Sequence, residues 1–182
     1  MLKERSGDWT MDGKRRDLPP SRLLLVDDDP ATLEAVACTL RHYLPALMIE
    51  PCDNAVSAVS RLGQERFAVI LSDFNMPDMD GLRLLRAARK CGSDATFILM
   101  TGNSTNDMLT QGLRFGMFCL VEKPLNRATF IPLVQQAVEC QQLRQEVAEL
   151  RRAIRESDIR GGTAIERLLP ETDEAFQPSL PY

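Results

Sequence analysis

The chain has 182 residues, of which 44% are hydrophobic and 26% are charged, and its formal net charge at pH 7 is −4. This length excludes a large multidomain enzyme, and the ordinary balance of apolar and charged residues predicts a soluble folded protein with a sizeable core. The acidic balance disfavours a polyanionic partner, so we expect no direct binding of nucleic acid.

The cysteines and the termini carry information about the compartment. Five cysteines are spread along the chain, mostly among apolar neighbours and without a C-x-x-C pair: Cys38, Cys52, Cys91, Cys119 and Cys140. This usage is typical of buried thiols in a reducing compartment. The first twenty residues hold nine charges and no signal-peptide-like apolar stretch, and no later apolar run reaches membrane-spanning length. We therefore expect a cytoplasmic protein without membrane contact.

Composition divides the chain into four segments. Residues 1–20 are polar and end in two prolines, which predicts a disordered arm. Residues 21–138 are predicted to form the folded domain, and residues 139–157 a helical extension of its last helix. Residues 158–182 are interrupted by glycine and proline and become acidic, which predicts a flexible tail.

Within the folded domain, short apolar runs alternate with longer segments of helical period. The runs that predict strands are 23–26, 47–50, 67–71, 97–100 and 117–121. The segments that predict helices are 30–44, 55–62, 80–91 and 104–115, with a fifth helix beginning near Asn126 or Thr129. Asp29 and Asn54 are predicted to cap the first two helices. The third run is continuously apolar, which indicates burial on both faces, and the alternation predicts an α/β fold with a doubly wound parallel sheet.

Polar residues follow four of the predicted strands. They are Asp27, Asp28 and Asp29 after the first, Asp73 after the third, Thr101 after the fourth and Lys123 after the fifth. Because the carboxyl ends of parallel strands meet at one edge of the sheet, we expect these side chains to share a site. Carboxylates that lie close together repel one another, and a divalent cation and a lysine would offset this electrostatic repulsion.

The residue types at this edge indicate a chemistry. Oxygen ligands without nearby histidine or cysteine favour Mg²⁺ over zinc, and Mg²⁺ commonly bridges carboxylates to phosphate oxygens. An aspartate in such a site can act as a nucleophile that accepts a phosphoryl group as an acyl phosphate. Asp29 is better explained as a helix cap than as a metal ligand, because Pro30 follows it.

Four segments together resemble the receiver domain of bacterial two-component response regulators. They are LLVDDDP at 24–30, LSDFNMPDMDG at 71–81, MTG at 100–102 and VEKP at 121–124. The resemblance covers residues 21 to about 140 and implies a flavodoxin-like sheet with strand order 2-1-3-4-5. It also implies that Asp73 is the phosphoacceptor, taking its phosphoryl group from a sensor histidine kinase or a phosphotransfer protein.

The resemblance further assigns roles to the other residues of the site. The groups that it implies for Mg²⁺ are Asp27, Asp28, Asp73 and Asn75, the last through its backbone carbonyl. Lys123 is expected to pair with the phosphoryl oxygens, and Thr101 to move its hydroxyl onto the phosphate and pull the following loop with it.

One position departs from the family pattern. The family often carries an aromatic residue three positions before the lysine, and this chain has Leu120 there. Phe118 is predicted to lie on the same face of the strand, so it could substitute only with rearrangement. Asn75 and Asn103 occupy positions that in this family tune how water reaches the acyl phosphate, and Gly102 is expected to leave the pocket open.

The helical extension carries a heptad pattern. Apolar residues spaced 3-4-3-4 form a seam with Leu133: Cys140, Leu143, Val147, Leu150 and Ile154. β-branched residues at a and leucine at d favour a parallel dimer. The flanking charges agree, with Glu139 and Glu146 at g and Arg144 and Arg151 at e. The alternatives are an amphipathic helix lying on its own receiver, and a linker too short to dimerise alone.

The predicted function is a phosphorylation-activated response regulator without a recognisable output domain, signalling through dimerisation or partner binding. We expect no enzymatic turnover beyond slow self-dephosphorylation. One alternative is a haloacid-dehalogenase-like phosphatase, although such enzymes need a second aspartate where this chain has Asn75. Another is the receiver and linker portion of a longer transcriptional regulator.

Overall fold

Strands and helices alternate along the chain in a computed structural model that describes residues 21–161, with side chains to residue 156. The strands are β1 (Arg22–Val26), β2 (Met48–Cys52), β3 (Val69–Asp73), β4 (Thr96–Thr101) and β5 (Met117–Glu122). The helices are α1 (Pro30–Tyr43), α2 (Ala55–Leu62), α3 (Gly81–Lys90), α4 (Asn106–Arg114) and α5 (Arg127–Gly161). The expectations for residues 1–20 and 162–182 lie outside the described residues.

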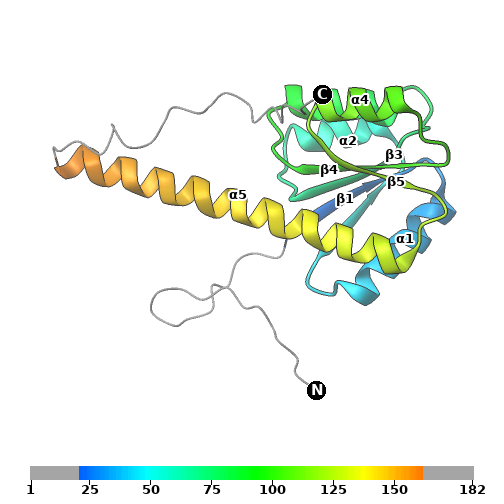
Figure 1. The fold of residues 1–182 in the computed structure, drawn as a ribbon, viewed down its shortest axis with the longest axis horizontal. Coiled ribbons are helices and arrows are strands. Elements are labelled where there is room, and N and C mark those ends of the chain that lie inside the picture. Colours follow the sequence, from blue (N-terminus) through cyan, green and yellow to red (C-terminus); the bar gives the residue numbers. More distant parts are fainter. Residues whose placement is uncertain (1–20, 162–182) are drawn as a thin grey trace, which may run out of the picture. The chain divides into compact units, whose positions relative to one another are not determined.

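The sheet confirms the predicted topology. All five strands are parallel in the order β2-β1-β3-β4-β5. One apolar cluster packs α2 and α3 on one face of the sheet, and a second packs α1 and the first part of α5 on the other. Figure 1 shows these two layers, with α2 and α4 together on one side. Every residue of β3 and β4 is buried, as expected for strands covered on both faces.

Side-chain caps set where the helices begin. Asp29 and Asn54 accept hydrogen bonds from backbone amides in the first turns of α1 and α2, which confirms both predicted caps. Helix α4 begins later than predicted, because Thr105 is its cap. The Ser104 hydroxyl, which stands at the predicted start, donates instead to the carboxylate of Glu122.

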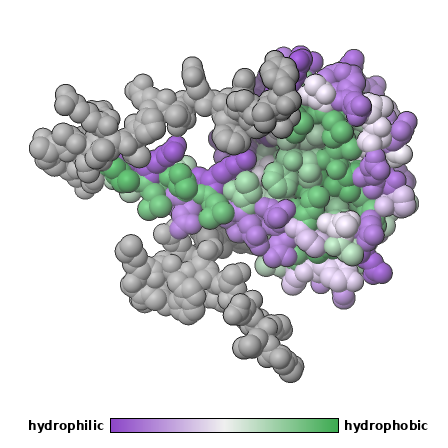
Figure 2. Space-filling model, in the orientation of Figure 1, coloured by the Kyte–Doolittle hydropathy of each residue, from purple (hydrophilic) through white to green (hydrophobic). Residues whose placement is uncertain are grey.

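Strand β5 contains a β-bulge, which overturns one prediction. The pairing with β4 shifts register between Phe97 and Ile98, so that the bulge adds a residue to β5. Leu120 packs in the cluster with α2 and α3, whereas Phe118 packs in the cluster with α1 and α5. The prediction that Phe118 and Leu120 share a face is therefore wrong, because the extra residue reverses the alternation. Figure 2 shows apolar side chains gathered on the face of the folded domain where β5 forms the edge of the sheet.

The cysteines are less buried than predicted. All five thiols are free, but Cys38 and Cys91 are exposed and Cys119 and Cys140 are only partly buried. Cys38 follows the buried Ala37 on α1, and the helical turn carries it away from the core. Cys91 caps the C-terminus of α3. Apolar neighbours in sequence are not neighbours on a helix face, so the expectation of buried thiols holds fully only for Cys52.

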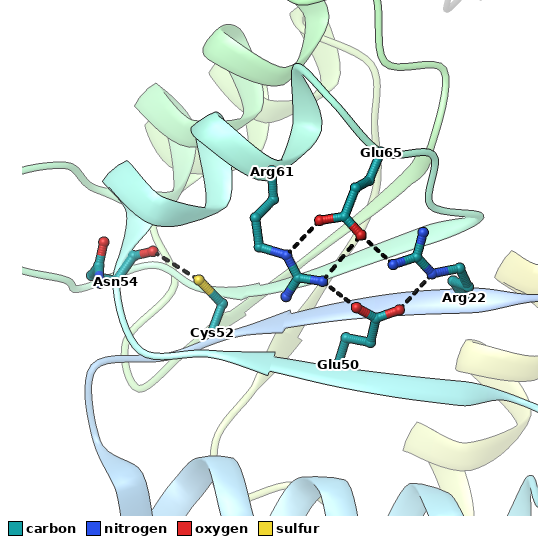
Figure 3. Close-up of polar contacts among 6 residues, drawn as sticks. All are labelled: Arg22, Glu50, Cys52, Asn54, Arg61 and Glu65. Carbon is teal, nitrogen blue, oxygen red and sulfur yellow. Dashed lines mark hydrogen bonds and ion pairs between the residues drawn. The ribbon is translucent and has the colours of Figure 1, made fainter.

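A charged cluster lies near the start of β1. It consists of Arg22, Glu50, Arg61 and Glu65, which alternate in sign and are joined in a ring of ion pairs (Figure 3). The guanidinium carbons of Arg22 and Arg61 lie 4.7 and 5.2 Å from the ring centroid of Phe67. The charged cluster therefore ties β1, β2, α2 and the loop before β3 together.

Helix α5 belongs to two compact units of the chain, the first ending at Gln142 and the second beginning at Leu143. In the first unit Leu133 packs against the core, so this residue of the predicted seam is partly buried. Pro132 lies inside the helix, in its second turn. In the second unit the seam is exposed: 61% for Leu143, 46% for Val147, 54% for Leu150 and 38% for Ile154. No helix in the described part of the chain is long and apolar enough to cross a membrane.

Candidate functional site

Three predicted site residues meet at the carboxyl end of the sheet. Asp27 directly follows β1, Asp73 ends β3, and Lys123 directly follows β5. The Lys123 Nζ atom lies 2.6 Å from Asp73 Oδ1 and 2.8 Å from Asp27 Oδ2. Because all strands of the parallel sheet end at the same edge, residues almost a hundred positions apart come within hydrogen-bond distance.

Burial makes this arrangement electrostatically important. The side chains of Asp27 and Asp73 are only 2% and 8% exposed, and that of Lys123 is 28% exposed. Burial acts to lower the pKa of Lys123, but hydrogen bonds to Asp27 and Asp73 outweigh it and raise that pKa above its ordinary value. The lysine therefore stays charged at neutral pH and offsets two carboxylates that would otherwise repel each other.

The second oxygen of each carboxylate is held by backbone. Asp27 Oδ1 accepts a hydrogen bond of 3.0 Å from the amide of Asp29, and Asp73 Oδ2 accepts one of 2.7 Å from the amide of Asn75. Each carboxylate is thus fixed at both oxygens. This holds the Asp73 carboxylate in one orientation beside the ammonium group of Lys123.

Two other predicted residues lie nearby but outside this ion-pair group. Asp28 is exposed, next to Asp27 in the chain. Thr101 ends β4 and is buried, and its hydroxyl is engaged by its own loop. The hydroxyl donates to the carbonyl of Asn103 at 3.0 Å and accepts from the amide of the same residue at 3.2 Å.

The donor chemistry of the site fits a hard divalent cation. Carboxylate oxygens of Asp27 and Asp73 converge on Lys123, and oxygen ligands of this kind suit such a cation. The exposed Asp28 directly follows Asp27 in the chain. In the described part of the chain, no three histidine, cysteine or acidic side chains are grouped closely enough to form a ready-made metal centre. Lys123 contacts one oxygen of each convergent carboxylate, so a cation bound here would share these carboxylates with the lysine.

Gly81, the first residue of α3, lies close to the site although its own role was not predicted from the sequence. A Cβ atom on Gly81 would lie 2.6 Å from the carbonyl oxygen of Asp73 and 2.5 Å from the side chain of Leu99. The amide of Gly81 also donates to the carbonyl of Phe74 at 2.9 Å. Helix α3 therefore begins against the backbone at the end of β3, and its N-cap Asp80 immediately precedes this contact. The Asp80-Gly81 pair in the sequence is the signal that points to it.

A family model for the response regulator receiver domain matches residues 23–135. The chain belongs to this family. Receiver domains are phosphoacceptor signalling domains, and the haloacid-dehalogenase alternative is not favoured by any similarity found.

Curated relatives are receiver-containing regulators. The chain is 31% identical over 147 residues to the C4-dicarboxylate transport transcriptional regulatory protein DctD of Pseudomonas aeruginosa, covering 81% of this chain and 31% of that protein. It is 33% identical over 114 residues to the response regulator protein FleR of the same organism, covering 63% and 24%. The chain thus spans about a third or less of the length of these relatives.

Solved structures agree on the fold. A CheY-like response regulator receiver domain protein from Methanospirillum hungatei superimposes with a TM-score of 0.63 at 26% identity, over 68% of this chain and 98% of that one. The chemotaxis protein CheY4 of Vibrio cholerae superimposes with a TM-score of 0.59 at 25% identity, over 64% and 98%. These matches confirm the predicted flavodoxin-like sheet.

Proposed function

We propose that this chain is a phosphorylation-controlled switch in which Asp73 is the phosphoacceptor. The observation that carries the proposal is the Lys123 ammonium group, held between Asp73 and Asp27 at the carboxyl end of the sheet. A cation in this place pairs with phosphoryl oxygens as well as with carboxylates. The donor is a phosphohistidine on a sensor histidine kinase or a phosphotransfer protein, and the site of action is the cytoplasm.

The chemistry is an in-line displacement at phosphorus. A carboxylate oxygen of Asp73 forms a bond to phosphorus while the bond from phosphorus to the imidazole nitrogen of the donor breaks. The imidazole leaves with the electron pair and takes up a proton from solvent. Lys123 then pairs with the oxygens of the transferred group, and the amide of Asn75 continues to orient the acceptor.

A magnesium ion completes the proposed site. The residues that hold it are Asp27, Asp28, Asp73 and the backbone carbonyl of Asn75. When bound, the ion supplies positive charge that offsets the oxygens of the phosphoryl group. Lys123 contacts both Asp27 and Asp73, so a bound ion would share these two carboxylates with the lysine.

The switch is carried by Thr101. Its hydroxyl turns from the peptide of Asn103 towards the phosphoryl group on Asp73, which requires both present hydrogen bonds to break. Asn75 stands where a phosphatase of the haloacid-dehalogenase type needs an acid, so the acyl phosphate is lost only slowly. The output is therefore a change of conformation rather than turnover.

The acceptor assignment is tested on the full chain with acetyl phosphate and Mg²⁺, followed by intact mass. We expect the wild type to gain one phosphoryl group and Asp73→Asn to gain none. Asp53→Asn, which changes an exposed aspartate in the loop before α2, is the matched control and should be modified like the wild type. Unmodified wild-type protein, or equal modification of Asp73→Asn, contradicts the proposal.

The C-terminal unit is proposed to pair with a second copy of this chain as a parallel coiled coil. Its apolar residues recur along one side of α5 and are exposed (Figure 2). The same spacing places Glu146 of one copy opposite Arg151 of the other, so charge complementarity supports in-register parallel pairing. The measured mass in solution distinguishes this dimer from a lone amphipathic helix or linker.

Two exposed valines on helices provide the test. Val147→Glu places a charge in the seam and should convert a dimer to a monomer, whereas Val56→Glu on α2 should leave the mass unchanged. Exchanging the charges in Glu146→Arg with Arg151→Glu should restore the pairing that either change alone weakens. A wild-type chain that is monomeric at tens of micromolar, with and without beryllofluoride, contradicts the pairing.

A further inference from the structure

The loop between β4 and α4 is tied to the end of β5 by a hydrogen bond that the proposed phosphoryl chemistry does not use. The Ser104 hydroxyl donates to Oε1 of Glu122. Glu122 is the register partner of Thr101 and directly precedes Lys123. The bond therefore lies between the strand that carries the switch hydroxyl and the strand that carries the ammonium group.

The segment from Thr101 to Ser104 is held at both ends. The amide of Lys123 donates to the carbonyl of Thr101 at 2.7 Å, which fixes the start of the segment on β5. Glu122 fixes its end through Ser104. Between these points, the Thr101 hydroxyl makes its two bonds to the peptide groups of Asn103.

Movement of Thr101 towards Asp73 disturbs this closed arrangement. The hydroxyl must leave Asn103, which removes the two bonds that give the loop its present shape. The loop then follows Thr101 only if its far end is free to move, and the Ser104–Glu122 bond opposes that movement. A contact that is made in one conformation and lost in the other shifts the equilibrium between them.

The side chains of β5 offer no second polar connection to this loop. Leu120 faces the cluster with α2 and α3 and has no polar atom, and Phe118 lies on the other face because of the bulge. Among the described residues, the side-chain hydrogen bond from β5 to the β4–α4 loop is the one made by Glu122.

We propose that Ser104 and Glu122 are positioning residues that hold the β4–α4 loop in its unphosphorylated conformation and release it when Thr101 engages the phosphoryl group. This inference rests on the proposed roles of Asp73 and Thr101. Its consequence is that part of the free energy of binding a phosphoryl group is used to break the bond. Loss of the bond therefore tightens binding of a phosphoryl mimic.

The test is the affinity of the full chain for beryllofluoride with Mg²⁺, measured by NMR titration. Ser104→Ala, which changes no charge, should bind the mimic about three- to tenfold more tightly, the range expected for the net worth of one hydrogen bond. Ser104→Thr keeps the hydroxyl and should restore the wild-type affinity. Comparing the affinity of Ser104→Ala with that of the double variant Ser104→Ala/Glu122→Ala measures the separate effect of losing the Glu122 charge next to Lys123.

A matched control removes a hydrogen bond of similar exposure from the same region. Gln111 donates to Asp107 at 2.7 Å on the surface of α4, so Gln111→Ala should leave the affinity unchanged. Thr101→Ala should abolish the gain produced by Ser104→Ala, because the bond acts through the hydroxyl. A purely stabilising role would change the unfolding midpoint of Ser104→Ala without changing its affinity for the mimic.

The outcomes separate this inference from the one on which it rests. Wild-type affinity in Ser104→Ala, or an equal gain in the Thr101→Ala background, overturns the positioning role while leaving Asp73 as acceptor. A wild-type chain that neither binds beryllofluoride nor is phosphorylated at Asp73 contradicts the proposed function itself.

Discussion

Lys123 and Asp73 are joined by an ion pair of 2.6 Å, and the same ammonium group reaches Asp27 at 2.8 Å. One cation thus offsets two buried carboxylates that come from different strands. The pair also fixes Asp73, the proposed phosphoacceptor, in the absence of a phosphoryl group. The contribution of Lys123 to stability and its contribution to phosphorylation can be measured separately.

The first prediction concerns Lys123→Ala. Removing the cation leaves two buried carboxylates facing each other, so the free energy of unfolding should fall by about 1–3 kcal/mol, after allowance for the partial exposure of the lysine. Magnesium should bind the variant more tightly than the wild type, because the competing cation is gone. Phosphorylation by acetyl phosphate should nevertheless slow at least about tenfold, since the charge that pairs with the phosphoryl oxygens is lost.

Urea unfolding with and without Mg²⁺ measures both effects. Lys90→Ala, at an exposed position in the last turn of α3, is the control and should behave like the wild type. If Mg²⁺ stabilises Lys123→Ala no more than it stabilises the wild type, the lysine and the metal do not share the carboxylates.

The second prediction compares Gly81, which lies against the backbone of Asp73, with Gly102, which directly follows β4. In Gly81→Ala the new Cβ would meet the carbonyl oxygen of Asp73, which is backbone and cannot easily move. We therefore expect the free energy of unfolding to fall by about 1–3 kcal/mol and phosphorylation to slow. Gly102→Ala meets nothing within 4 Å and should unfold like the wild type. Thermal unfolding and intact mass provide the readouts, and equal stability of the two variants would refute the close approach at Gly81.

Strand-end position was enough to bring Asp27, Asp73 and Lys123 together from the sequence, because parallel strands place their carboxyl ends at one edge. Local caps were also predictable, since Asp29 and Asn54 act on the residues that directly follow them. The face of Phe118 was not predictable. It depends on a bulge in the pairing of two strands, which periodicity within one strand does not reveal.

Other contacts were not predictable because they join residues that are far apart along the chain. The Ser104–Glu122 hydrogen bond joins residues 18 positions apart, and no sequence motif relates these two positions. The charged cluster joins four residues from separate elements for the same reason. The roles of the site residues, by contrast, came from the family resemblance, because geometry alone shows which groups meet but not which one is phosphorylated.

The third prediction is a pH dependence that arises in the charged cluster. The hydrogen bonds from Arg61 and then Arg22 lower the pKa of Glu65 from 4.5 to about 2. A carboxyl group whose pKa is lower in the folded state adds stability that is present above its unfolded pKa and lost as the pH falls. The free energy of unfolding should therefore decrease as the pH drops from about 5 towards 2.

Glu65→Gln should remove this part of the dependence and unfold with a flatter profile over the same range. Glu34→Gln, which changes an exposed glutamate on α1, should keep the wild-type profile. Chemical unfolding at a series of pH values decides the matter, and identical slopes for Glu65→Gln and the wild type would show that the ring of ion pairs does not form in solution.

The fourth prediction concerns two neighbouring glutamines on α5. The side chain of Gln141 is completely buried, and its Oε1 accepts a hydrogen bond of 3.4 Å from Thr96. Its Nε2 has no hydrogen-bond partner among the described residues, which is a costly condition for a buried donor. Gln142 is only partly buried and donates to Ser21 at 3.2 Å.

Replacing each glutamine by methionine preserves length and volume while removing the amide. Gln141→Met should raise the free energy of unfolding by about 1 kcal/mol, because the cost of a buried unsatisfied donor disappears and the lost bond to Thr96 is long. Gln142→Met should lower it by about 0.5 kcal/mol, because a satisfied and partly exposed bond is lost. Urea unfolding of both variants measures the difference. A loss of stability in Gln141→Met larger than that in Gln142→Met would mean that the buried amide has a partner in solution.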